Sequence, residues 1–254
     1  MRYFFSGVLA LAAASISAQE APLSVNYESG TNLNVLYRNE ASGKLFASTR
    51  GFGVTFRQAK HVTQRTRSYY ELELQNLRHP KESKSVGDGA QKRRYVYGKV
   101  NGVLMLRGAV GLQNVLYSKG DHKAVEVRYS YSLGPTLAFA KPYYVRVMGP
   151  RRGAGSNQEF DIKFNSENYS PDSGRVQGRS DFATGLPELK VYPGATAKFN
   201  LSFEYAPYTN LIRAIETGIC IDYFPKALPL MAKNPSENLI ISIHVGFVFG
   251  RKWF

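Results

Sequence analysis

The chain has a single cysteine, Cys220, among its 254 residues. One cysteine excludes an intrachain disulfide, so the fold must be stabilised by other means. Beyond the first 18 residues no apolar run is long enough to form a membrane-spanning helix, which excludes such a helix from that part of the chain. A sustained helical stripe of apolar residues is missing as well, and this disfavours a helical fold.

The first 18 residues have the composition of a secretory signal peptide. Arg2 precedes a short apolar run, and small residues precede Gln19. The run is too short to span a bilayer as a helix, so we expect cleavage after Ala18 and a mature domain of residues 19–254. No cysteine stands at the expected cleavage site, which disfavours a bacterial lipoprotein anchor.

Acidic residues are scarce as well. The chain has 19 Asp and Glu against 33 Lys and Arg, which gives a formal net charge of +14. In an exported protein this excess favours acidic partners such as phosphorylated lipid or polyanionic glycan. We do not expect nucleic acid among the partners, and no cofactor is predicted.

What the sequence does contain is a two-residue alternation of apolar and polar side chains. The segment SYYELELQNL shows it, since the apolar Leu72 and Leu74 flank Glu73. A period of two is typical of β-strands with one apolar face. It predicts eight strands, within residues 23–37, 45–58, 68–77, 100–117, 123–134, 196–205, 215–224 and 238–254.

Eight alternating strands fit either a soluble sandwich or a closed barrel. Long and short connections alternate along most of this chain, as they do in outer-membrane barrels with short periplasmic turns and long external loops. We therefore predict an all-β fold, an eight-stranded antiparallel transmembrane β-barrel of the outer-membrane type with long basic external loops. The even strand count places both termini in the periplasm. The apolar face would then meet lipid, and the aromatic residues near strand ends would lie at the headgroups.

The polar face of the predicted strands carries many charges. Eight strands enclose room only for side chains, and buried charges must be paired. We therefore expect a plugged interior crossed by ion pairs, without an open pore. The predicted interior network consists of Arg57, Glu71, Glu73, Arg107, Glu126, Arg128, Lys198, Glu204, Glu216 and Asp222.

The excess positive charge then belongs to the external loops, beside phosphates and anionic sugars of the outer leaflet. Contact with lipopolysaccharide is the natural hypothesis, and a merely solvated basic loop is the alternative. The candidate contacting residues are Lys81, Lys84, Lys92, Arg93, Arg94, Arg151 and Arg152.

Residues of catalytic type also occur on the polar face. Ser242 and His244 share the inward side of the last strand, and Glu216 or Asp222 could reach His244 if the register allowed. Small outer-membrane acyl hydrolases use such a set. A polar barrel interior contains these residue types by chance, however, so no catalytic residue is assigned. The histidines show no metal-ligand spacing, and no metal site is predicted.

Seven short segments follow one another along the chain: RHPKE, YGKVN, LRGAVGLQNVL, GPTLAFAKPYY, VYPGATAKFNLSFEY, IETGICIDYFPKALPLMA and GFVFGRKW. As an ordered set they resemble a largely uncharacterised family of outer-membrane β-barrel proteins from Bacteroidetes. The resemblance implies the outer membrane of a Gram-negative cell and a barrel, and it lends no catalytic residues. One difference concerns the C-terminus. Outer-membrane barrels usually end on a Phe in step with the lipid-facing residues, whereas Phe254 is in step with the inward-facing residues and Trp253 with the lipid-facing ones.

Together these features predict an integral outer-membrane protein with a structural or interaction role. The external loops would contact lipopolysaccharide or other envelope proteins. Two alternatives remain open at this point: a lipid-modifying hydrolase of the barrel wall, and a small barrel component of an envelope secretion complex.

Overall fold

The computed structural model of the chain describes residues 39–63, 65–87, 93–118, 124–150, 157–163, 175–206, 210–232 and 234–253. The described strands belong to one compact unit, Leu36–Phe254. The expected signal peptide, the first expected strand and Phe254 lie outside the described residues. Within the described ranges, no helix has the length and apolar character needed to cross a membrane.

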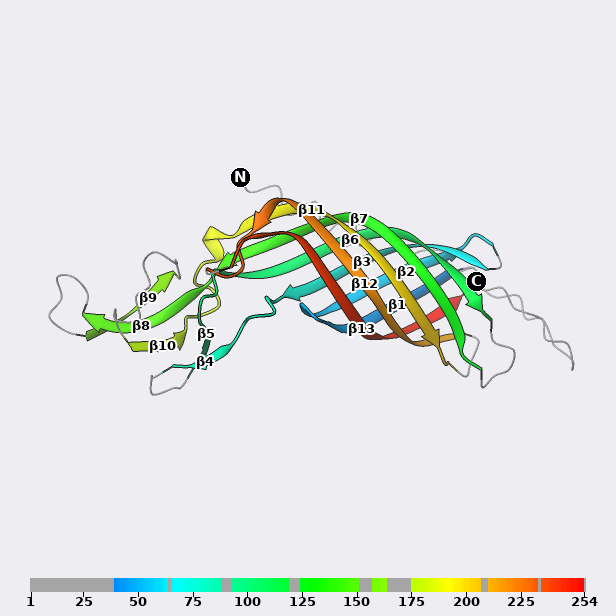
Figure 1. Cartoon of the computed structure of the whole chain (residues 1–254). Helices are drawn as coiled ribbons and strands as arrows, with labels where there is room; N and C mark the ends of the chain where they lie inside the picture. The colour runs from blue at the N-terminus through cyan, green and yellow to red at the C-terminus, as the bar shows by residue number, and fades with distance from the viewer. Residues whose placement is uncertain are drawn as a thin grey trace, which may run out of the picture. The chain divides into compact units, whose positions relative to one another are not determined.

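Eight long antiparallel strands close into a barrel (Figure 1). Each strand pairs with its two neighbours in the order β1-β13-β12-β11-β7-β6-β3-β2, and β2 returns to β1. The predicted fold class is confirmed. The barrel strands are β1 (Asn39–Ser48), β2 (Gly51–His61), β3 (Thr66–Leu77), β6 (Asn101–Tyr117), β7 (Glu126–Pro142), β11 (Lys190–Glu204), β12 (Leu211–Leu228) and β13 (Glu237–Trp253).

One predicted strand is wrong. The segment 45–58 is two strands, β1 and β2, joined by the turn at Thr49 and Arg50. Leu45 and Phe52 are 61% and 54% exposed on the outer face although their numbers differ in parity, which a continuous strand does not allow. Gly51 makes the turn possible with φ +135°, a conformation that favours glycine. β1 is therefore a separate strand and one of the eight that close the barrel.

The two longest connections lie at the same end of the barrel. The β2–β3, β6–β7 and β11–β12 connections are short and share the end where β1 begins and β13 finishes. The predicted long connection after β2 shrinks to residues 62–65, because β2 and β3 both extend further than the alternation indicated. At the other end lie the tight β1–β2 turn, the β12–β13 connection, which equals β6–β7 in length, and the much longer β3–β6 and β7–β11 connections.

The long connections fold into small sheets of their own. β4 (Lys84–Val86) pairs with β5 (Arg94–Val96) between β3 and β6. Between β7 and β11 lies a three-stranded sheet in the order β10-β8-β9, made of β8 (Tyr144–Pro150), β9 (Asn157–Lys163) and β10 (Arg175–Arg179), followed by the 3₁₀ helix η2 (Leu186–Glu188). In Figure 1 this sheet projects past the end of the barrel wall. Within this sheet the side chains of Val145 and Val147 on β8 are buried, as expected for two residues on the same face of a strand.

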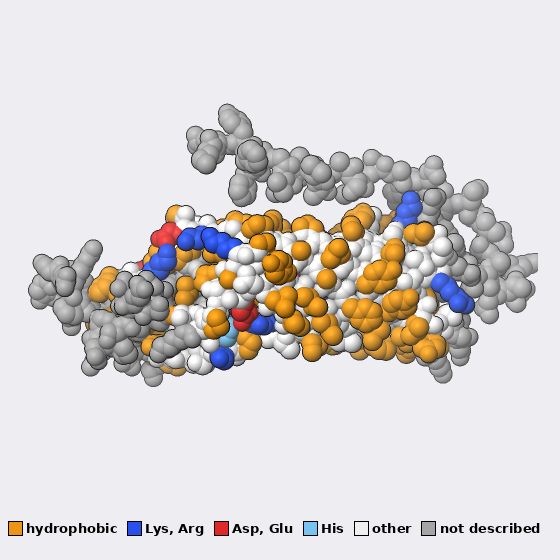
Figure 2. Space-filling view, turned by 45° about the horizontal axis from the view of Figure 1, so that its top comes forward, with side chains coloured by type: hydrophobic (Ala, Val, Ile, Leu, Met, Phe, Trp, Pro, Cys, Tyr) orange, Lys and Arg blue, Asp and Glu red, His pale blue; other side chains and the backbone are white. Residues whose placement is uncertain are grey.

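The outer face of the barrel is apolar. Figure 2 shows hydrophobic side chains spread over the barrel wall, with charged side chains toward its ends. On β13 the outward residues are Leu239, Ile241, Ile243, Val245, Phe247 and Phe249, all exposed. An apolar surface that continues around the wall is too large for a protein surrounded by water. In lipid, closure of the sheet satisfies every backbone group, so this wall is built to span a membrane.

Inside the barrel, two glycines make room for an aromatic ring. A Cβ at Gly53 would lie 2.7 Å from Cζ of Phe46, and a Cβ at Gly246 would lie 2.7 Å from Cβ of Phe46. Phe46 in turn packs edge-on against His244, with ring centroids 5.7 Å apart. The interior therefore holds the Phe46 ring only because Gly53 and Gly246 carry no side chain.

We predict that Gly53→Val destabilises the folded barrel by about 1–3 kcal/mol, because the added side chain overpacks the Phe46 ring and the carbonyl oxygen of Leu74, which lies 2.4 Å from the Cβ position. The midpoint of urea unfolding in lipid vesicles measures the effect. Gly43→Val is the matched control, since a Cβ at Gly43 has its nearest neighbour at 3.9 Å. Equal midpoints for the two variants would contradict the packing role of Gly53.

Candidate functional site

All ten residues of the predicted interior network point into the barrel, and each has an ion-pair partner. The pleat of the strands explains the placement, since alternate side chains share one face. The pairs separate into two clusters, one in the middle of the barrel and one near its short-turn end.

The middle cluster consists of Lys44, Arg57, Arg107 and Lys198 with Glu71, Glu73, Glu216 and Asp222. Glu216 is fully buried and accepts bonds from Lys44 Nζ at 2.8 Å and Arg57 Nη1 at 2.7 Å. Arg107 donates from Nε to Asp222 Oδ1 at 2.8 Å and from Nη2 to Asp222 Oδ2 at 2.7 Å. Four cations face four carboxylates, so the formal charge of this cluster is zero.

The second cluster consists of Glu40, Arg67, Glu126, Arg128, Glu204 and Lys252. Arg67 Nη1 lies 3.2 Å from Glu40 Oε1, and Lys252 Nζ lies 2.8 Å from Glu204 Oε1. Three cations again balance three carboxylates. Neither cluster leaves a formal charge uncompensated inside the wall, as burial requires.

Sequence reasoning missed four charged residues of these clusters. Glu40 and Lys44 lie on β1, which was not recognised as a strand. Arg67 is one residue before the expected start of its strand and shares the parity of Glu71. Lys252 shares the inward parity of His244, so the alternation of the last strand already contained its signal.

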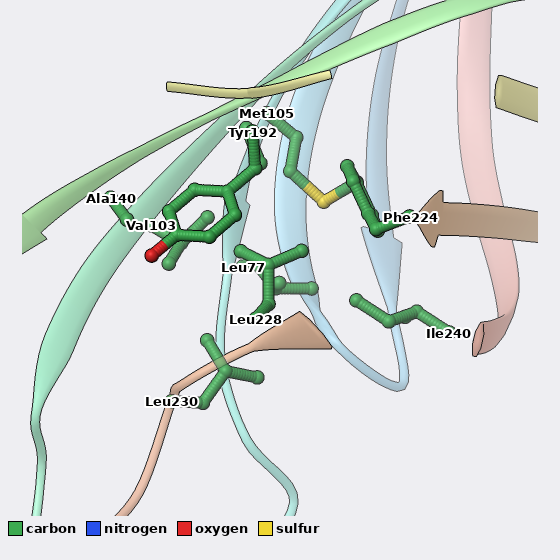
Figure 3. Packing of buried hydrophobic residues seen from close by; sticks show 10 residues of the cluster. Leu77, Val103, Met105, Ala140, Tyr192, Phe224, Leu228, Leu230 and Ile240 are labelled. Atoms are coloured by element: carbon green, nitrogen blue, oxygen red, sulfur yellow. The ribbon is translucent and has the colours of Figure 1, made fainter. Parts of the chain in front are cut away.

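Toward the long-connection end, apolar side chains fill the interior. Figure 3 shows the side chains of Met105 and Phe224 next to each other, with Leu77 and Leu228 nearby. Met105, Phe224 and Leu228 have no exposed surface. We name this cluster the apolar plug; it comprises Leu77, Val103, Met105, Ala138, Ala140, Tyr192, Phe224, Leu228, Leu230 and Ile240. The interior is therefore ionic in its middle and toward the short-turn end, and apolar toward the other end.

Ser242 and His244 are buried on the inward face of β13. In the part of the chain that the structure describes, Nε2 of His244 has no hydrogen-bond partner. The carboxylate of Glu216 is held by Lys44 and Arg57, and that of Asp222 by Arg107. A serine, histidine and carboxylate relay is therefore not assembled among these residues, and the wall separates them from the lipid outside.

A second candidate site lies among the elements outside the barrel. A pocket with a volume of about 590 Å³ opens between the end of β3, the β4–β5 hairpin and the end of β10. We call it the basic pocket. It is lined by Asn76, Arg78, Glu82, Lys84, Arg93, Arg94, Tyr95, Val96, Lys99, Tyr143, Arg179, Ser180, Asp181 and Phe182.

Close backbone packing joins the walls of the basic pocket. A Cβ at Gly87, after β4, would lie 2.2 Å from the carbonyl oxygen of Gln177 on β10. Gly178, with φ +143°, allows the backbone to approach Arg93, because a Cβ there would lie 2.5 Å from Cβ of Arg93. The hairpin and the three-stranded sheet are thus packed closely against each other.

The charges of the basic pocket do not balance. Six cations line it against two acids, Glu82 and Asp181. Lys99 pairs with Glu82 at 2.8 Å, and Arg93 pairs with Asp181 at 3.2 Å. The four other cations make no ion pair with any described residue; they are Arg78, Lys84, Arg94 and Arg179.

Tyr143 contributes an uncharged hydrogen-bond donor, its hydroxyl group, to the lining of the basic pocket. The backbone N–H of Val96 donates to Oη of Tyr143 at 3.1 Å, so the hydroxyl proton is left for another partner. A tyrosine hydroxyl is protonated at neutral pH, and burial raises the pKa of Tyr143 further above its usual value.

Of the predicted anion-contacting residues, the structure brings Lys84, Arg93 and Arg94 together in this pocket. Lys81 lies outside the lining, with Nζ bonded to Oδ1 of Asn234 at 3.1 Å. Lys92, Arg151 and Arg152 are outside the described residues. Arg78 and Lys99 lie in the same β3–β6 connection as Lys84, Arg93 and Arg94 but were not among the predicted contacts. Arg179 was missed because it belongs to the β7–β11 connection, which only the fold brings to the pocket.

The comparisons with known proteins give structural matches alone. No family model matches the chain, and the curated proteins yield no match either. Neisserial surface protein A matches with 8% identity and a TM-score of 0.41, over 85% of this chain and 97% of that one. Ail, the attachment invasion locus protein of Yersinia pestis, matches with 4% identity and a TM-score of 0.39, over 86% of this chain and 100% of that one.

A second structure of Ail, in complex with the heparin analogue sucrose octasulfate, matches with 6% identity and a TM-score of 0.39, over 86% of this chain and 100% of that one. Likeness at this level gives no information on the ligand or activity of the chain.

Proposed function

We propose that the chain is an integral protein of the outer membrane that acts through its external surface and does not conduct ions. The closed barrel, its apolar wall and the position of the longer connections at one end support this placement. In that orientation the start of β1 and the end of β13 face the periplasm, and the basic pocket faces outward.

The closed interior supports a role other than transport. Seven cations and seven carboxylates pair within the two ionic clusters, and the apolar plug fills the end that we place outside. An ion crossing this interior would have to break buried pairs and then enter an apolar region, and both steps are costly.

We predict that the purified barrel produces no unitary conductance in planar bilayers at neutral pH, because its interior is occupied by paired charges and apolar side chains. Single-channel recording in symmetric salt measures this directly. Stable conductance steps from the wild-type chain would contradict the closed interior.

The observation that carries the interaction role is the basic pocket. The ionic clusters have no net charge, so the formal charge of +14 lies outside them. At the end that we place outside the cell, four cations of the pocket lack acidic partners among the described residues. Phosphates and anionic sugars of the outer leaflet are complementary to such a surface, so we infer that the protein binds lipopolysaccharide.

Membrane fractionation followed by affinity purification in mild detergent tests this function. The expected result is recovery in the outer-membrane fraction with bound lipopolysaccharide, which raised salt concentration releases because the contact is electrostatic. Recovery in the inner membrane, or an outer-membrane preparation free of lipopolysaccharide at low salt, would overturn the proposal.

A further inference from the structure

The basic pocket adjoins the face of the barrel that meets lipid. Along β3 the outward side chains Tyr70, Leu72 and Leu74 are exposed apolar residues. Asn76 continues this row with the same parity, and Arg78 follows it; both line the pocket. The lining of the pocket and the lipid-facing row of β3 are therefore one continuous surface.

The neighbours of Asn76 in the sheet support the same conclusion. Asn76 pairs with Phe52 on β2 and with Leu104 on β6, and both of these side chains are exposed on the outer face. The guanidinium of Arg78 lies over the Phe52 ring, 5.2 Å from its centroid. A molecule in the pocket would contact Arg78 directly above apolar side chains, where headgroups meet acyl chains.

The charge of the pocket limits the number of acidic groups that it can neutralise. Arg78, Lys84, Arg94 and Arg179 contribute four positive charges without an acidic partner among the described residues. One phosphate monoester carries about −1.5 to −2 at neutral pH, so two such groups carry about −3 to −4. Two phosphates therefore match the unpaired charge, and one phosphate does not.

The other features of the lining favour a sugar between the phosphates. The volume of about 590 Å³ lies in the range of pockets for small organic ligands. Tyr95, Tyr143 and Phe182 provide aromatic surfaces, and the free hydroxyl proton of Tyr143 can be donated to a sugar oxygen. Nζ of Lys141 lies over the Phe182 ring, 4.1 Å from its centroid, and with the residue 71% exposed the ring still offers surface to a ligand.

We propose that the basic pocket binds the headgroup of a glycolipid whose saccharide carries two phosphate groups, while the acyl chains lie along Leu74, Phe52 and Leu104 on the barrel wall. This inference rests on the proposed function and specifies the part of lipopolysaccharide that is bound, its phosphorylated and acylated saccharide. We propose a membrane-embedded glycolipid rather than a soluble phosphate compound because Asn76 and Arg78, which line the pocket, continue the lipid-facing row of β3.

Binding of defined glycolipids to the full mature chain in detergent micelles tests the inference. We expect lipid A with two phosphates to bind at least about tenfold more tightly than lipid A with one, since each charge-assisted contact is worth about a factor of ten or more. Fructose 1,6-bisphosphate, which has two phosphates but no acyl chains, is expected to compete only at much higher concentrations. The double variant Arg94→Gln, Arg179→Gln is expected to weaken binding of the two-phosphate lipid by about a hundredfold.

The matched control is Lys226→Gln, which removes an exposed cation on β12 outside the pocket and is expected to bind like the wild type. Heat-modifiable gel migration shows whether each variant is folded. Equal affinity for lipid A with one and two phosphates would overturn the inference, as would equal affinity for the soluble bisphosphate or unchanged binding by the folded double variant.

This experiment separates the two proposals. If the wild type retains lipopolysaccharide and the double variant retains it equally well, the pocket inference fails while the proposed function stands. If the chain fractionates outside the outer membrane, the proposed function fails, and the micelle assay still measures the preference of the pocket for two phosphates.

Discussion

Replacing Arg107 with methionine is expected to lower the free energy of unfolding of the barrel by about 3–5 kcal/mol. Arg107 is 1% exposed and binds Glu73 and Asp222 on opposite sides of the interior. Its removal leaves Asp222 without its cationic partner in a site that water does not reach. Urea unfolding in lipid vesicles, followed by gel mobility, measures the loss.

A second variant tests the physical reason for this loss. Arg107→Met combined with Asp222→Leu removes the pair together, while Glu73 keeps its bond to Lys198 at 2.8 Å. The double variant is expected to be more stable than Arg107→Met alone, because an apolar pair in place of a buried ion pair costs little. Lys60→Met, at an exposed position, is the control for loss of a positive charge. If the double variant were less stable than the single one, the cost would not come from the unpaired carboxylate.

Replacing Ile219 with lysine is expected to destabilise the protein in vesicles by about 2–4 kcal/mol, the cost of a cation on the lipid face near the bilayer midplane. Ile219 is 45% exposed in the middle of β12, between Phe199 on β11 and Ile243 on β13. The comparison of unfolding midpoints in vesicles measures this cost.

Val62→Lys provides the matched control, because Val62 is 63% exposed in the short connection after β2 rather than on the wall. Its effect is expected to be small. If Ile219→Lys were tolerated as well as Val62→Lys, the apolar wall would not be in contact with hydrocarbon, and the membrane placement would be wrong.

The two-residue alternation was sufficient to predict the barrel and the inward direction of its charges. In SYYELELQNL, the same parity that turns Leu72 and Leu74 outward turns Glu71 and Glu73 inward, whatever partners they meet. The prediction of one strand over 45–58 was wrong because it overlooked the β1–β2 turn. The outward apolar residues have odd numbers in β1, as at Leu45, and even numbers in β2, from Phe52 onward. That change of parity is itself the sequence signal of the turn.

The apolar plug and the basic pocket were not predictable in the same way. The plug combines Met105 on β6, Phe224 on β12 and Leu230 beyond it, and their distances in the chain give no sign of contact. Arg78 and Arg179 lie in connections about a hundred residues apart and line one pocket only because the β4–β5 hairpin and β10 pack together. Register and loop packing decide such contacts, and neither has a local sequence pattern.

The sequence by itself determined which side of each strand meets lipid and which carries charge, because the pleat of a β-strand turns successive side chains to opposite faces. Only the tertiary structure decided which charges meet. Lys44 and Glu216 are 172 positions apart, and closure of the barrel brings them to 2.8 Å. The physical reason is that side-chain direction is a local property of the backbone, whereas partner choice depends on the register of strands that are distant in the chain.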